Sequence, residues 1–348
     1  MPLSLSLKID HPMTPPRILV VGGAGYIGSH MVKLLLAHGC QVMTLDNFST
    51  GHRDAIVGGE FVRADLADRA ALDALFASRA FDAVMHFASC IQVGESVNAP
   101  AKYYANNVTN TLNLLDAMVA HGVKHFIFSS SAAVYGNPIL VPIAEDHPKA
   151  PINPYGRTKW MVEQILEDYD RAYGLKSVSL RYFNAAGADP AGELGERHEP
   201  ETHLIPLALR AASGRAPDIK VFGRDYNTPD GTCIRDYVHV VDLCEAHRLA
   251  LARLMQDGGS AVYNLGNGNG FSVAEVIAAA ERVTDRAIRV TPMPRRAGDP
   301  PRLVADASLV CRELNWQPRF DCLETIIAHA WAWESRSVTI PALAEGVV

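Results

Sequence analysis

Short apolar runs alternate with longer amphipathic stretches along the first half of this chain. The runs are apolar throughout, which is typical of strands covered on both faces of a parallel sheet. The stretches between them repeat apolar residues at helical spacing. This alternation predicts an α/β fold with a doubly wound parallel sheet. The expected strands are 17–21, 41–45, 82–87, 124–129 and 176–182, and the expected helices lie near 27–38, 68–78, 100–121 and 154–173.

The pattern changes after residue 183, where Gly, Pro and charged residues become frequent. A length of 348 residues allows one α/β domain and a smaller companion. We expect a loose N-terminal extension over 1–16, a first domain of 17–183 plus about 237–264, and a smaller mixed α/β domain of about 184–236 plus 265–348. The later elements are expected as helices near 203–213, 272–283 and 321–335 and strands at 220–222 and 287–293, with a βα stretch over 237–264.

Composition excludes several classes of protein. The chain is 48% hydrophobic and carries a net charge of −6, so neither disorder nor a broad basic surface for nucleic acid or anionic membranes is indicated. The six cysteines form no C-x-x-C pair, so we predict no metal site and a reduced, cytoplasmic protein. No apolar run approaches the ~20 residues that span a bilayer.

A glycine-rich turn follows the first expected strand. Gly22, Gly25 and Gly28 are spaced so that the chain can turn tightly and approach a pyrophosphate, with a helix opening at that point. Asp46 ends the second strand, 18 residues after Gly28. A carboxylate there accepts hydrogen bonds from ribose hydroxyls and repels a 2′-phosphate. The sequence therefore predicts a dinucleotide site that prefers NAD to NADP.

A tyrosine and a lysine occupy one face of a predicted helix. Asn153 suits the cap and Pro154 the first turn, which places Tyr155 and Lys159 four residues apart on one side. A phenol that acts as a base at neutral pH needs a pKa about three units below its usual value near 10, and nearby positive charge can supply that shift. Ser131 follows directly after the strand expected at 124–129 and is expected to point into the same crevice.

Taken with these motifs, the sequence resembles the extended short-chain dehydrogenase/reductase family, whose cofactor domain is of the Rossmann type, and within it the UDP-hexose 4-epimerases. The resemblance covers nearly all of 17–340. It is carried by GGAGYIGSH (22–30), LDN (45–47), HFAS (86–89), VGESV (93–97), YYANNV (103–108), FSSSAAVYG (128–136), NPYGRTK (153–159), RYFNAAGA (181–188), DGTCIRDYVHV (230–240), YNLGNG (263–268), RRAGDP (295–300) and ELNW (313–316).

The resemblance implies NAD-dependent epimerisation at C4 of UDP-glucose or UDP-galactose through a transient 4-keto sugar. It makes Tyr155 the base, Lys159 the residue that lowers its pKa and binds the nicotinamide ribose, and Ser131 the partner of the 4-oxygen. Those three residues are also implied contacts of the cofactor, and Ser131 and Tyr155 of the substrate. The further implied NAD contacts are Gly22, Gly25, Tyr26, Ile27, Gly28, Asp46, Asn47, Phe48, Ser49, Thr50, Asp65, Leu66, Phe87, Ala88, Asn106 and Phe183.

The resemblance also implies a UDP-sugar site in the later segments. Two arginines suit a diphosphate because the guanidinium fork binds phosphate oxygens in pairs. The implied contacts are Asn184, His203, Leu204, Lys220, Val221, Phe222, Arg235, Arg296 and Asp299.

The chain departs from the family pattern at four positions. Val21 replaces the usual Thr before the glycine turn, and Ile91 stands where some members have a Lys near the cofactor phosphates. His203 stands where many members have an Asn. Leu303 replaces the bulky Tyr of members that exclude N-acetylated sugars, which leaves UDP-N-acetylhexosamines open as substrates.

Other functions share the core motifs. Epimerases of UDP-pentoses or UDP-hexuronates are close alternatives. A nucleotide-sugar dehydratase needs an Asp-Glu pair where this chain has Ala132 and Ala133, and a non-catalytic NAD-binding regulator is expected to have lost part of the Ser–Tyr–Lys set. The resemblance also implies a homodimer formed through the helices near 100–121 and 154–173.

Overall fold

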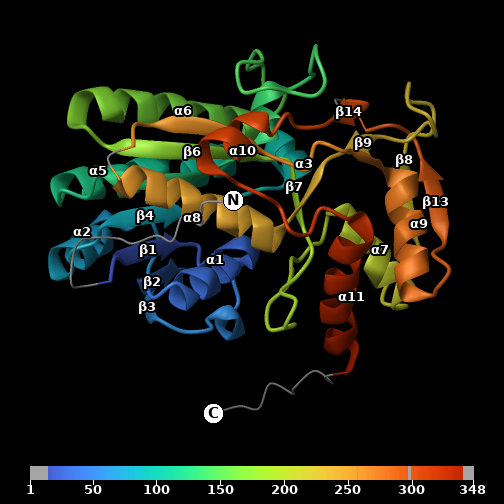
Figure 1. Cartoon of the computed structure of the whole chain (residues 1–348), viewed down its shortest axis with the longest axis horizontal. Helices are drawn as coiled ribbons and strands as arrows, with labels where there is room; N and C mark the ends of the chain where they lie inside the picture. Colours follow the sequence, from blue (N-terminus) through green and yellow to red (C-terminus); the bar gives the residue numbers. More distant parts are fainter. Residues whose placement is uncertain (1–14, 257, 297–298, 340–348) are drawn as a thin grey trace, which may run out of the picture.

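Seven parallel strands form the central sheet of the computed structural model, which describes residues 15–256, 258–296 and 299–339 (Figure 1). The strand order is β11-β6-β5-β4-β1-β2-β3, so the direction of winding reverses between β1 and β4. This confirms the predicted doubly wound α/β fold. The strands are β1 (Arg17–Val21), β2 (Gln41–Asp46), β3 (Glu60–Arg63), β4 (Ala83–His86), β5 (His125–Ser131), β6 (Lys176–Tyr182) and β11 (Ala261–Leu265).

Helices cover both faces of the sheet, as the uniformly apolar strands require. Alternate residues of β1 belong to different cores: Ile18 and Val20 pack on one face, and Leu19 and Val21 on the other. The first core includes residues of α1 (Tyr26–Ala37) and α8 (Val240–Met255), and the second includes residues of α2 (Arg69–Ser78), α5 (Asn110–Ala120) and α6 (Pro154–Tyr173).

The helix expected over 100–121 is interrupted. The structure has α4 (Pro100–Tyr104), one π turn η2 (Ala105–Thr109) and then α5. The amide of Asn107, inside the π turn, donates to the carbonyl oxygen of Cys90 at 3.0 Å and to Thr158 Oγ1 at 3.1 Å. A π turn of this kind often marks a functional site.

Several short elements were not predicted. The edge strand β3 is mostly exposed and mixes charged with apolar residues, so it lacks the apolar run of the inner strands. The helix α3 (Val93–Asn98) and the 3₁₀ turns η1 (Arg53–Ala55) and η3 (Ala132–Tyr135) are too short to show a period.

The remaining elements form a smaller group beside the sheet, at the right of Figure 1. Three helices, α7 (Leu204–Ala212), α9 (Val273–Thr284) and α11 (Leu323–Thr339), share one core there. The short α10 (Ser308–Leu314) packs instead on the sheet. The strands pair as β7 (Asn184–Ala186) with β10 (Tyr237–His239), β8 (Ile219–Phe222) with β13 (Val290–Met293), and β12 (Phe271–Ser272) and β14 (Arg302–Leu303) with β9 (Ile234–Arg235).

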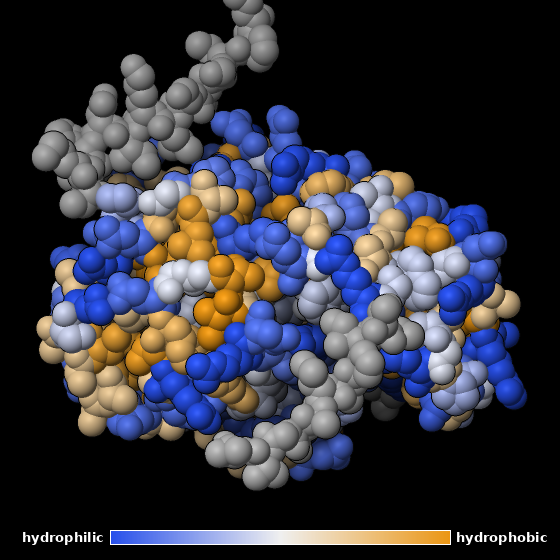
Figure 2. Space-filling model, turned by 90° about the horizontal axis from the view of Figure 1, so that it is seen from below, coloured by the Kyte–Doolittle hydropathy of each residue, from blue (hydrophilic) through white to orange (hydrophobic). Residues whose placement is uncertain are grey.

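Figure 2 shows one face of the molecule, on which hydrophobic residues gather mainly over the half that contains the sheet. No helix in the described ranges is long and apolar enough to cross a bilayer. All six cysteines are free thiols. Most of the predicted extension over 1–16 and the end of the predicted second domain, 340–348, lie outside the described residues.

Candidate active site

The glycine turn between β1 and α1 is tightly packed. Gly22 has a φ of +79°, and a Cβ there would lie 2.6 Å from the backbone nitrogen of Ala88. A Cβ on Gly28 would lie 2.1 Å from the carbonyl oxygen of Gly22. No side chain caps the first turn of α1, whose N-cap is Gly25, so its N–H groups remain available to an anion. This cradle of backbone without side chains fits the pyrophosphate of a dinucleotide.

Asp46, at the end of β2, is buried and fixes the neighbouring loops. One of its carboxylate oxygens accepts the N–H of Ala24 at 3.0 Å, and the other accepts that of Phe48 at 2.8 Å. Asn47 donates to Asp65 at 2.8 Å, which joins two further predicted cofactor contacts. The carboxylate therefore stands beside the glycine turn, where the sequence analysis expects the ribose of NAD. The predicted Ser49 and Thr50 that follow are exposed.

The other predicted cofactor residues come from several elements around the same turn. The Tyr26 hydroxyl donates to the carbonyl oxygen of Gly187 at 2.7 Å. Asn106, in the π turn, donates to the side chain of Asn107 at 2.9 Å. The apolar members Ile27, Leu66, Phe87, Ala88 and Phe183 pack against the hydrophobic cores, and Gly22 and Gly28 form the turn itself.

Ser131, Tyr155 and Lys159 converge at the carboxyl end of β5. Ser131 is the last residue of that strand, and Tyr155 and Lys159 lie in the first two turns of α6. The helix begins as predicted, because the Asn153 side chain accepts the N–H of Gly156 at 2.8 Å and Pro154 occupies the first turn. The Ser131 side chain acts on Tyr155, because it lowers the pKa of the phenol. An open α/β sheet binds its ligands at this end of the strands.

Lys159 is buried and held by two oxygen acceptors. Its Nζ donates to Ser89 Oγ at 2.8 Å and to the carbonyl oxygen of Ser129 at 2.7 Å, and lies 5.0 Å from the ring centre of Phe128. Burial lowers the pKa of Lys159 to about 7. The ammonium is 5.8 Å from the ring centre of Tyr155.

The pKa of Tyr155 does not follow the sequence-based expectation. Desolvation by the surrounding protein raises the pKa of the phenol above its usual value, and the hydrogen bond to Ser131 lowers it only in part. Lys159 does not lower the pKa of Tyr155 in the protein without its ligands. Its Nζ instead donates to Ser89 and Ser129. A phenolate at neutral pH therefore needs further positive charge beside the ring.

A buried ion pair, which the sequence analysis missed, lies beneath these residues. Arg181 on β6 and Glu163 on α6 have side chains that are each 3% exposed, with Nε of Arg181 2.9 Å from Oε1 of Glu163. Glu163 also accepts the Ser130 hydroxyl at 2.5 Å, and Arg181 donates to the hydroxyl of Tyr135 at 2.9 Å. The pair links α6 to both strands that flank the site, but no short-range sequence pattern marks it.

The predicted diphosphate residues are brought together in two pairs. The Arg235 guanidinium lies 2.9 Å from Oδ1 of Asp299, and the Arg296 guanidinium lies 3.8 Å from the ring centre of Phe222. The N–H of Asp299 also donates to the carbonyl oxygen of Arg296 at 3.4 Å. Asp299 therefore links the two pairs: its side chain holds Arg235, and its backbone contacts that of Arg296.

The other predicted substrate residues are more scattered. Asn184, on β7, donates through its side chain to the carbonyl oxygen of Asp236 at 2.8 Å. Lys220 is exposed, whereas its neighbour Val221 is buried in the core of the smaller group. Leu204 is the first residue of α7 and packs against the same core.

His203, the N-cap of α7, belongs to a cluster that the sequence analysis did not recognise. Its Nδ1 lies 2.8 Å from Oε1 of Glu196 and 2.9 Å from Oε1 of Glu201. His198 Nδ1 lies 3.1 Å from the same oxygen of Glu196. The pattern Glu-x-His-x-x-Glu-x-His over 196–203 is the signal that could have revealed it.

Leu303 lies close to the predicted sugar position. It packs, with Phe183, against a small apolar cluster formed by Ala132, Val134, Tyr135 and Ile143, directly after Ser131. The side chain at this position therefore packs against residues that directly follow Ser131 in the chain.

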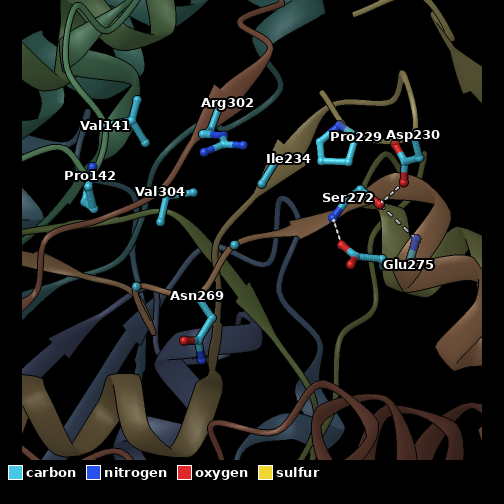
Figure 3. A pocket seen from close by; sticks show the side chains of 12 residues that line it. Val141, Pro142, Pro229, Asp230, Ile234, Asn269, Ser272, Glu275, Arg302 and Val304 are labelled. Atoms are coloured by element: carbon cyan, nitrogen blue, oxygen red, sulfur yellow. Dashed lines mark hydrogen bonds between the residues drawn. The ribbon is translucent and has the colours of Figure 1, made fainter. Parts of the chain in front are cut away.

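A separate cavity of about 270 Å³ lies beyond β14, lined by Arg302 and Val304 but not by Leu303 (Figure 3). Ser272 caps α9, because its Oγ accepts the N–H of Glu275 at 3.0 Å and its own N–H donates to the Glu275 side chain at 2.7 Å. Its hydroxyl also donates to Asp230. None of the predicted catalytic, cofactor or substrate residues lines this cavity.

Comparison with known proteins agrees with this geometry. Residues 18–266 match the model of the "NAD dependent epimerase/dehydratase family". A UDP-glucose 4-epimerase of Halalkalibacterium halodurans is 50% identical over 316 residues, covering 91% of this chain and 95% of that protein.

Solved structures extend the comparison. The UDP-glucose 4-epimerase of Brucella ovis in complex with NAD is 52% identical, with a TM-score of 0.89 over 91% of this chain and 97% of the other. The UDP-Glc/GlcNAc 4-epimerase of Campylobacter jejuni is 46% identical, with a TM-score of 0.81 over 92% of this chain and 99% of the other.

Proposed function

Because the chain belongs to the NAD dependent epimerase/dehydratase family, we infer that it epimerises C4 of UDP-glucose and UDP-galactose with NAD as its cofactor. The observation that carries this inference is the meeting of Ser131, Tyr155 and Lys159 at the carboxyl end of β5, on the same edge of the sheet as the glycine turn. The relatives that match over almost their whole length include UDP-glucose 4-epimerases, among them one solved with NAD.

The residues of the chain would hold NAD in a fixed orientation. The glycine turn of Gly22, Gly25 and Gly28 receives the pyrophosphate, and Asp46 faces the adenosine ribose. Lys159 is placed to bind the nicotinamide ribose. Bound NAD would supply reversible hydride chemistry at C4 of the sugar.

Tyr155 moves the proton of the reaction. Its phenolate oxygen takes the proton of the sugar 4-hydroxyl, and the phenol returns a proton to the 4-oxygen once the stereochemistry has changed. Ser131, which lowers the pKa of Tyr155, would hold the 4-oxygen beside the phenol. Positive charge beside the ring lowers the pKa of Tyr155 against the desolvation that raises it.

Arg235 and Arg296 are placed to bind the diphosphate of the UDP-sugar. Arg235 is held by Asp299 and by the carbonyl oxygen of Pro300 at 2.9 Å, which fixes the direction of its guanidinium. Phe222, under Arg296, offers an aromatic face in the same place. The sugar then extends toward Leu303 and Ser131.

The alternative with a structural argument is 4-epimerisation of UDP-N-acetylhexosamines. Leu303 is smaller than Tyr and borders Ser131 through the cluster of Ala132 to Ile143. The relative of Campylobacter jejuni is named for both UDP-Glc and GlcNAc.

UDP-pentoses and UDP-hexuronates share the same core requirements and stay as further alternatives. A dehydratase is disfavoured because Ala132 and Ala133, after Ser131, carry no group that transfers protons. A non-catalytic regulator is disfavoured because Ser131, Tyr155 and Lys159 are all present.

A panel of UDP-sugars tests the proposal. The purified protein is incubated separately with UDP-glucose, UDP-galactose, UDP-GlcNAc and UDP-GalNAc, and with a UDP-pentose and a UDP-hexuronate. NMR then identifies the C4 stereochemistry of each product. We expect each UDP-hexose to give a mixture with its C4 epimer. Failure of both UDP-glucose and UDP-galactose to react would refute the proposal.

We also propose that the protein is a cytoplasmic homodimer. Its six free cysteines suit a reducing compartment. The exposed apolar side chains include Met161 on α6, and Val93 and Val97 on α3, which would be covered by a second copy. Light scattering after gel filtration tests the assembly, and the mass of a single chain would exclude it.

A further inference from the structure

Four potential metal ligands lie together in the segment between β7 and α7. One ligand atom from each of Glu196, His198, Glu201 and His203 can be chosen so that all four lie within 4.8 Å of one another. The N···O distances from His203 Nδ1 are 2.8 Å to Glu196 and 2.9 Å to Glu201. From His198 Nδ1 they are 3.1 Å to Glu196 and 4.0 Å to Glu201.

The two carboxylates are buried without a permanent cation. The side chains of Glu196 and Glu201 are 7% and 1% exposed. Among the described residues, no Lys or Arg lies within 4.0 Å of either carboxylate. The nearby arginines pair elsewhere, Arg197 with Asp54 and Arg210 with Glu199. Two facing carboxylates in a poorly hydrated site need positive charge between them.

The imidazole hydrogen bonds are shared between the two carboxylates. His203 Nδ1 has at most one N–H, yet it faces an oxygen of Glu196 and an oxygen of Glu201 at nearly equal distances. His198 Nδ1 faces the same oxygen of Glu196. One cation at the centre would use all four groups at once.

We propose that Glu196, His198, Glu201 and His203 bind a zinc ion. Zinc takes imidazole nitrogen and carboxylate oxygen in four-coordinate tetrahedral sites, whereas Mg²⁺ and Ca²⁺ prefer oxygen alone. Ligand distances of 2.0–2.1 Å imply ligand-to-ligand distances of about 3.3 Å. The four His-to-Glu distances of 2.8–4.0 Å lie on both sides of that value, and all four ligand atoms lie within 4.8 Å of one another, so side-chain movements are needed to complete the tetrahedron.

Backbone contacts position this zinc site. Oε1 of Glu201 accepts the N–H groups of Thr202 at 2.7 Å and of His203 at 2.9 Å. Trp333 Nε1, on α11, donates to the carbonyl oxygen of Glu196 at 3.3 Å. A zinc ion here would join the long segment after β7 to the start of α7, and so order the residues that lead into the proposed substrate site. The imidazoles of His198 and His203 are 21% and 38% exposed, which gives the ion a path of entry.

Metal content tests the proposal directly. The full chain is purified without a polyhistidine tag, treated with a chelator, incubated with ZnSO₄ and desalted, and its zinc is measured by mass spectrometry. We expect about one zinc per chain for the wild type. The His198→Ala variant is expected to retain less than a tenth of that amount. The matched control His38→Ala, which removes an exposed imidazole at the end of α1, should retain the wild-type content.

A second measurement uses the wild type alone, so it does not depend on whether a variant folds. Co²⁺ titrated into the chelator-treated protein should give the visible absorption of tetrahedral Co²⁺, saturating at one ion per chain, and Zn²⁺ should abolish it. The melting temperature should rise with bound zinc. Zinc content at the level of a buffer blank, together with no tetrahedral Co²⁺ spectrum, would show that the cluster is only an ion-pair network. Because the readouts are metal content and spectra, failure here is independent of the UDP-sugar assay.

Discussion

The Nζ of Lys159 on α6 donates a 2.7 Å hydrogen bond to the backbone carbonyl oxygen of Ser129 on β5. This bond ties α6, which carries Tyr155, to the strand that ends in Ser131, two residues further on. It also holds the ammonium 5.8 Å from the ring centre of Tyr155, while its hydrogen bonds go to Ser89 and Ser129. The proton chemistry of Tyr155 and the ionisation of Lys159 can therefore be examined separately.

Tyr155→Phe removes the phenolic oxygen and little else. We expect the variant to retain NAD and to lose about 10²–10⁴-fold in turnover, because general acid–base catalysis contributes on that order. The rate of UDP-galactose epimerisation measures turnover. The amount of nucleotide that acid releases from the purified protein measures NAD retention. Tyr173→Phe, at a side chain that is 54% exposed, is the control and should behave like the wild type. Wild-type turnover in Tyr155→Phe would refute the assigned mechanism.

The ionisation of Lys159 should make folding stability depend on pH. Burial lowers its pKa in the folded chain to about 7, below the ordinary value of 10.5. Between these values the unfolded chain binds the proton and the folded chain does not, so stability rises with pH by up to ~1.4 kcal/mol per unit.

Chemical unfolding of cofactor-free wild type and Lys159→Met between pH 7 and 10 measures this effect. We expect the wild type to gain stability relative to the variant as the pH rises, because Met has no proton to release. A difference in unfolding free energy that does not change over this range would contradict the assignment.

Gly28→Ala should abolish retention of the cofactor. A Cβ at this position would lie 2.1 Å from the carbonyl oxygen of Gly22, so the turn that receives the pyrophosphate must open. The wild type is expected to carry NAD(H) after purification without added cofactor, and the variant to carry less than a tenth as much. Gly259→Ala is the matched control because no atom lies within 4 Å of the added Cβ. Equal nucleotide content in the two variants would contradict the proposal that the glycine turn binds the pyrophosphate.

Arg181→Met should destabilise the fold strongly. It leaves the buried carboxylate of Glu163 without its partner, which typically costs about 3–5 kcal/mol. The double variant Glu163→Gln/Arg181→Met should recover part of that loss. Arg171→Met breaks an exposed pair with Glu167 and should cost less than ~1 kcal/mol. Denaturant unfolding compares the three, and equal costs for both single variants would contradict this account.

Leu303→Tyr should narrow the range of substrates. The larger ring would occupy space beside Phe183 and the turn after Ser131, where an N-acetyl group is expected to lie. We expect kcat/KM for UDP-GlcNAc to fall by roughly 10-fold or more, with UDP-glucose changed much less. Leu140→Tyr, at a side chain that is 72% exposed, is the control. A parallel loss for both sugars would place Leu303 outside the specificity pocket.

Local patterns were sufficient for much of the first half of the chain. The apolar runs predicted five strands of the sheet, and the Asn153–Pro154 cap predicted the start of α6. These features depend on neighbours within a few residues, so a single sequence carries them. The helix expected over 100–121 was wrong in one respect, because the π turn around Asn107 depends on contacts with Cys90 and Thr158.

By itself, the sequence determined the alternation of strand and helix, the glycine turn and the Tyr155–Lys159 spacing, since each follows from periodicity over a few residues. Only the tertiary structure decided which distant groups meet. Arg235 and Asp299 pair across 64 positions, and Arg181 meets Glu163 from a different element. The tertiary structure also decided the pKa of Tyr155, because desolvation by the folded chain raises it. No sequence motif reports desolvation.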